Sequence, residues 1–133
     1  MNQAVVCVTG SRVGVPAGAV EFVLSVLVAP GAAVWVGDAR GVDSVVLAWC
    51  RARGVAVRVW PAAWSRWGRS AGPRRSAAMV AALPAGSAVV AFSAGPLAAS
   101  RGTAHCVGFA RARGLVVLGF SNLAGVCQPV TLF

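Results

Sequence analysis

Short apolar runs rich in valine alternate along the chain with longer stretches in which apolar residues recur at helical spacing. The short runs predict strands over 5–9, 33–36, 55–60, 87–92 and 115–120. The stretches between them predict helices over about 17–29, 43–53, 73–83 and 103–113. The tail, 121–133, is ambiguous and is compatible with an added edge strand.

This order of elements predicts an α/β fold. Continuously apolar strands that alternate with helices are typical of a parallel sheet covered on both faces. We therefore expect a Rossmann-like three-layer α/β/α sandwich with a mainly parallel sheet of at least five strands. The 133 residues contain no repeat and no linker, so we expect a single domain over 1–133.

Composition bears on location and assembly. Hydrophobic residues make up 58% of the chain, yet no apolar run reaches the roughly 20 residues needed to span a bilayer. The N-terminus has no basic segment followed by a long apolar run, so we expect a cytoplasmic protein with no membrane contact. The predicted helix 17–29 is apolar almost all round, which favours a homo-oligomer formed through it.

Cysteine and histidine offer little chemistry. Cys7, Cys50, Cys106 and Cys127 form no C-x-x-C pair, and His105 is the only histidine, so we expect buried thiols and no metal site. His105 and Cys106 are adjacent and should point in different directions on a helix. We see no nucleophile or general base and expect no resident cofactor, which leaves enzyme activity open.

The positions of the arginines are more informative. The formal net charge is +9, and all twelve basic residues are arginine. Arg51, Arg53, Arg111 and Arg113 lie in last helical turns, where the helix dipole favours cations. Five others lie just before or within the first turn of a predicted helix, where the dipole opposes a cation: Arg12, Arg40, Arg74, Arg75 and Arg101.

All these helix starts meet at the carboxyl edge of a parallel sheet, where such folds bind ligands. Arginines and free backbone N–H groups at one edge predict a phosphate site. The alternative, that the arginines point into water, stays open. Two of the three acidic residues, Asp38 and Asp43, lie in the segment GDARGVD, 37–43. Asp43 suits either a helix cap or a functional role. Asp38 suits either a contact with ribose hydroxyls or an ion pair that holds Arg40 or Arg12.

Five short motifs occur along the chain in the following order: GSR (10–12), GDARGVD (37–43), PAAW (61–64), AGPRR (71–75) and RGT (101–103). Together they resemble the YspA-like branch of the SLOG superfamily, whose Rossmann-like domains are related to the Lonely Guy proteins and the DNA-processing protein DprA. The resemblance covers about residues 5–118. It implies a nucleotide-type ligand, as in families proposed to sense or process nucleotide signals. With the arginine pattern, it gives these candidate site residues: Gly10, Ser11, Arg12, Gly37, Asp38, Arg40, Gly41, Asp43, Gly72, Arg74, Arg75, Ser76, Arg101, Gly102 and Thr103.

Two positions depart from the family pattern. Ser76 stands where AGPxRN carries asparagine, and Cys106 stands where the phosphoribohydrolase motif PGGxGTxxE carries its catalytic glutamate. A thiol does not replace a carboxylate in acid–base work, which argues against cleavage by that mechanism. We expect Arg12, Arg74 and Arg101 to hold phosphate, and Gly10, Gly37, Gly41 and Gly102 to let the backbone approach it.

Two alternatives remain. The segments GDARGVDSVVLAW and RRSAAMVAAL are similar to motifs of DprA, which binds single-stranded DNA. Here Trp60, Trp64 and Trp67 among arginines would suit stacking and phosphate contact, although core or subunit contacts explain the tryptophans too. The other alternative is a structural protein that works by self-assembly.

Overall fold

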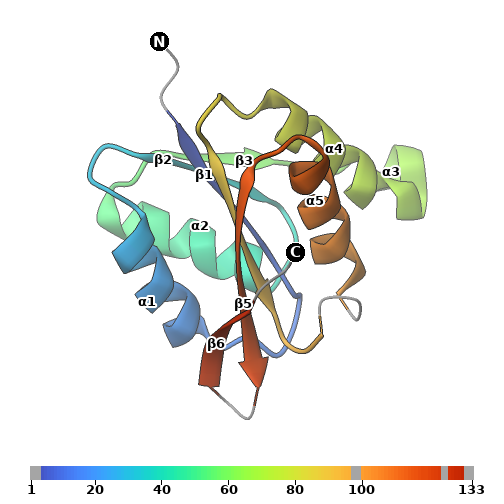
Figure 1. The fold of residues 1–133 in the computed structure, drawn as a ribbon. Helices are drawn as coiled ribbons and strands as arrows, with labels where there is room; N and C mark the ends of the chain where they lie inside the picture. The colour runs from blue at the N-terminus through green and yellow to red at the C-terminus, as the bar shows by residue number, and fades with distance from the viewer. Residues whose placement is uncertain (1–3, 97–99, 124–125, 131–133) are drawn as a thin grey trace.

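Six strands form one sheet in the order β3-β2-β1-β4-β5-β6 (Figure 1). The computed structural model describes residues 4–96, 100–123 and 126–130. The parallel strands are β1 (Val5–Gly10), β2 (Ala33–Gly37), β3 (Val57–Trp60), β4 (Ala88–Ser93) and β5 (Val116–Leu123). The tail adds β6 (Val126–Val130), which is antiparallel to β5. The Rossmann-like prediction is confirmed.

Four main helices lie close to the predicted positions. They are α1 (Ala17–Leu27), α2 (Val42–Arg53), α4 (Ala71–Ala82) and α5 (Arg101–Ala112). The segment between β3 and α4, which the sequence suggests is a loop, instead holds the short helix α3 (Trp64–Trp67) and a 3₁₀ turn (Gly68–Ser70). No helix in the described ranges is long and apolar enough to cross a lipid bilayer.

The sheet is covered on both faces. Helices α1 and α2 lie on one side of it, and α4 and α5 lie on the other (Figure 1). Leu24 of α1 and Val46 of α2 pack in one core cluster with Val8, whereas Met79 of α4 packs in the other cluster with Cys7. Neighbouring strand residues thus enter opposite cores, which explains why the strands are apolar without alternation.

The strand order reverses direction between β1 and β4. From β1 the chain moves outward through β2 to β3, and from β4 it moves the other way to β5. The segments that follow β1 and β4 therefore diverge at the carboxyl edge of the sheet. Such a switch point leaves a crevice in open α/β sheets.

Candidate functional site

A cleft of ≈ 860 Å³ opens at this switch point. The structure brings these predicted site residues to its lining: Gly10, Ser11, Arg12, Asp43, Gly72, Arg75, Ser76, Arg101, Gly102 and Thr103. Residues outside the predicted set line it as well: Thr9, Val13, Ala39, Trp64, Arg69, Pro73, Ala94, Gly95, Ser100 and His105. Gly37, Asp38, Arg40, Gly41 and Arg74 are not among the lining residues.

Hydrogen bonds between serines fix the floor of the cleft. The hydroxyls of Ser11 and Ser100 lie 2.6 Å apart, and Ala94 N–H donates to Ser11 Oγ at 3.0 Å. The Ser11 N–H donates to the carbonyl of Phe92 at 2.9 Å. The segment after β1 is thereby tied to the segment after β4, so the polar floor is held in one arrangement.

The start of α5 forms one wall. Arg101, Gly102 and Thr103 all line the cleft in the first turn of the helix. Thr103 is only 2% exposed, and its Oγ1 has no hydrogen-bond partner in the described part of the chain. The first N–H groups of a helix lack intrahelical acceptors, and the helix dipole favours an anion there. The Thr103 hydroxyl beside them is a buried polar group whose hydrogen-bonding capacity no described residue satisfies.

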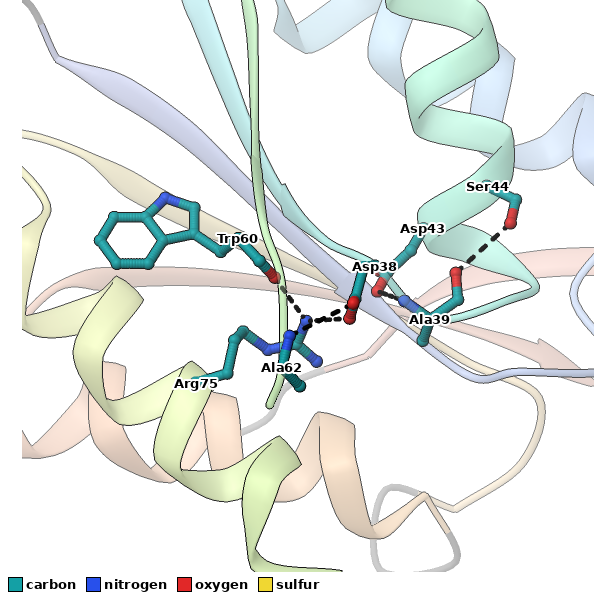
Figure 2. Close-up of polar contacts among 7 residues, drawn as sticks. All are labelled: Asp38, Ala39, Asp43, Ser44, Trp60, Ala62 and Arg75. Atoms are coloured by element: carbon teal, nitrogen blue, oxygen red, sulfur yellow. Dashed lines mark hydrogen bonds and ion pairs between the residues drawn. The ribbon is translucent and has the colours of Figure 1, made fainter. Parts of the chain in front are cut away.

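Arg75 is held across the ends of two strands (Figure 2). Its Nη1 donates to the carbonyl of Trp60 at 3.0 Å and to Asp38 Oδ1 at 3.2 Å. Asp38 Oδ2 in turn accepts the N–H of Ala62 at 3.2 Å. A side chain at position 37 would overlap the Arg75 guanidinium, so Gly37 makes room for this ion pair.

These contacts revise the role predicted for Asp38. The carboxylate pairs with Arg75, not with Arg40 or Arg12. Because Asp38 is not part of the cleft lining, the structure does not place it for a ribose contact. It acts on the cleft through Arg75, which lines it. Local sequence patterns do not predict a pair between residues that stand 37 positions apart.

Asp43 is a buried carboxylate in the lining, with 6% of its surface exposed. Of the two roles left open for Asp43, the helix cap does not occur: α2 begins at Val42, and Asp43 Oδ2 accepts the N–H of Ala39 at 3.1 Å, before the helix (Figure 2). Burial raises the pKa of Asp43 to about 6, although the Ala39 hydrogen bond and the nearby charge of Arg75 lower it. Asp43 can therefore exchange a proton near neutral pH.

Two predicted phosphate ligands, Arg74 and Arg40, do not line the cleft. Arg74 donates from Nε to Ser70 Oγ at 3.2 Å, and its guanidinium lies 3.7 Å from the ring centroid of Trp67. Arg40 is exposed and lies outside the lining. Arg69 takes a place that the sequence did not assign, because α3 and the 3₁₀ turn bring it to the cleft.

Two of the predicted site glycines, Gly41 and Gly10, are required by the fold itself. Gly41 has a φ of 81°, and a side chain there would overlap the backbone of Arg12. At the end of β1, a Cβ on Gly10 would stand 2.6 Å from Val42 Cβ. These two glycines let the chain segments around the cleft approach each other.

A thiol pair lies close to the cleft but does not line it. Cys7 and Cys106 are fully buried and hydrogen-bonded to each other, and that bond together with burial raises the pKa of Cys7. His105, one residue away, is exposed and lines the cleft, so the two neighbours do point in different directions. Within the described ranges, no three His, Cys, Asp or Glu side chains gather as a metal would require.

The charge balance of the lining is strongly positive. Arg12, Arg69, Arg75 and Arg101 face one carboxylate, Asp43. Guanidinium groups of this kind form strong, charge-assisted hydrogen bonds with anions. Searches of family models, curated proteins and solved structures gave no match.

Proposed function

We propose that this chain binds a phosphorylated nucleoside in the cleft between the ends of β1 and β4. The observation that carries the proposal is the first turn of α5, where no described residue pairs with the buried Thr103 Oγ1 and the N-cap residue, Ser100, makes no side-chain cap hydrogen bond to the helix. Arg12 and Arg101 line the same cleft and supply positive charge for phosphate.

The resemblance to the YspA-like SLOG branch supports the same ligand class, and we propose that the chain belongs there as a cytoplasmic nucleotide sensor. Binding comes before catalysis in this proposal. Cys106 occupies the position of the glutamate of the phosphoribohydrolase motif, and it is buried outside the cleft lining. Asp43 is the carboxylate that the cleft offers for a nucleotide-processing step.

The test is direct binding of AMP and adenosine, measured by calorimetry. We expect AMP to bind and adenosine to bind far more weakly, because the arginines recognise phosphate. Arg12→Ala and Arg101→Ala should each weaken AMP binding about 10- to 100-fold, the range for a lost hydrogen bond to a charged group. Arg51→Ala is the matched control: it removes the same charge from the last turn of α2, outside the cleft. Equal effects of all three variants would refute the cleft as the binding site.

Single-strand nucleic-acid binding is the second candidate. Trp64 and Trp67 are exposed, and the guanidinium groups of Arg66 and Arg74 lie over Trp67. Such a surface suits stacked bases and phosphates. Oligonucleotide affinity that falls with salt, with a slope of about −0.7 per phosphate contacted, would favour this candidate over a mononucleotide ligand.

We also propose that two copies associate through the outer face of α1. Val20, Val23 and Leu24 are buried on its inner face, while Phe22 and Val26 are 69% and 68% exposed. Helix α1 contains no arginine and carries Glu21, so on a chain of net charge +9 it presents the face with least repulsion to a second copy.

A further inference from the structure

Trp64 stands at the boundary between the phosphate-binding part of the cleft and solvent. It begins the short helix α3, and its side chain lines the cleft although 41% of its surface is exposed. The Trp64 side chain is therefore partly packed against protein and partly exposed to solvent. Aromatic side chains commonly line ligand pockets, and their faces stack on other planar groups.

Gly72, in the first turn of α4, helps to set the position of the Trp64 ring. A Cβ placed on Gly72 would stand 3.2 Å from the Cη2 atom of Trp64, so a side chain at position 72 would push the ring away from the first turn of α4 by a few tenths of an ångström. Gly72 lines the cleft, and its lack of a side chain also leaves room for the ring of Trp64.

One face of the Trp64 ring is already in contact with a planar cation, the guanidinium group of Arg12. The Arg12 guanidinium carbon lies over the ring, 5.5 Å from the centroid. Arg12 is also one of the arginines that face the candidate phosphate position. A ligand phosphate would compete for this guanidinium, because its hydrogen bonds to phosphate are stronger than its contact with a ring. The face of the indole would then be free for another flat group.

We propose that Trp64 is the base-stacking residue of this site, so that the ligand is a nucleotide with its base against the indole and its phosphate near Arg12 and the start of α5. This inference rests on the proposed function and narrows it: sugar phosphates without a base should be poor ligands. Stacking recognises any base by its flat face. Trp64 therefore selects for the presence of a base without choosing among the bases.

Trp67 provides a matched control on the same helix. It is 39% exposed, close to the value for Trp64, but it does not line the cleft, and its ring is covered by Arg74 at 3.7 Å and Arg66 at 4.8 Å. Trp67→Leu removes an equally exposed indole from α3 without touching the cleft. Trp64→Leu removes the stacking ring, and Trp64→Phe keeps an aromatic face.

The experiment compares AMP with ribose 5-phosphate on the wild type and these three variants by calorimetry. We expect the wild type to prefer AMP. Trp64→Leu should weaken AMP binding about 5- to 100-fold and ribose 5-phosphate binding less than about twofold, with Trp64→Phe in between. Trp67→Leu should leave both affinities unchanged.

Three results would overturn the inference, and they separate it from the proposed function. If Trp64→Leu binds AMP as the wild type does, the base lies elsewhere, but the phosphate site stands. If Trp64→Leu weakens both ligands equally, Trp64 only shapes the cleft. If the wild type binds neither ligand, the proposed function fails together with the base site.

Discussion

At the scale of single residues, the buried carboxylate of Asp43 lowers the free energy of unfolding when it is ionised. Its pKa of about 6 lies above the ordinary value of 3.8, so the folded protein holds the proton more tightly than the unfolded chain does. The free energy of unfolding should therefore fall as pH rises from about 4 to above 6, by at most about 3 kcal/mol from this group. Asp43→Asn removes the charge and keeps an oxygen for the Ala39 N–H. Urea unfolding should find the variant more stable than the wild type at pH 7.5, and this difference should be about 2 kcal/mol smaller at pH 4.5. A difference that is the same at both pH values would contradict this assignment.

At the scale of elements, the turn before α2 positions Arg12 through Gly41. Gly41→Ala imposes both an unfavourable positive φ and an overlap with the Arg12 backbone. Gly31→Ala is the control, because Gly31 has a φ of 82° but open space around its Cα. We expect Gly31→Ala to lower the free energy of unfolding by about 1 kcal/mol, and Gly41→Ala to lower it by 2 kcal/mol or more, roughly. Calorimetry should show weaker AMP binding only for Gly41→Ala. Equal loss of stability in both variants would show that the segment around Arg12 moves away from the added Cβ at little cost in free energy.

The same elements show how far the sequence could predict the site. Apolar periodicity located the strands and main helices, because burial on both sheet faces leaves a regular pattern. It missed α3, whose four residues, WSRW, are too few to show a period. The adjacent Arg74 and Arg75 share one motif, but consecutive helical residues point about 100° apart, so one stacks on Trp67 and the other reaches Asp38. That choice depends on tertiary contacts that local patterns do not contain.

At the scale of the whole molecule, net charge and the apolar face of α1 oppose each other. A charge of +9 on each copy disfavours association at low ionic strength, whereas Phe22 and Val26 favour it. Because salt screens the repulsion and leaves apolar contact intact, the dimer fraction should rise between about 0.02 and 0.5 M NaCl. Light scattering coupled to size exclusion would measure the dimer fraction.

Phe22→Ser combined with Val26→Ser should keep the protein monomeric in high salt. Val13→Ser, which removes a 71% exposed valine before α1, should dimerise as the wild type does. A monomer at every salt concentration would rule out this interface, and a dimer that dissociates with salt would indicate an interface held by charges instead of by α1.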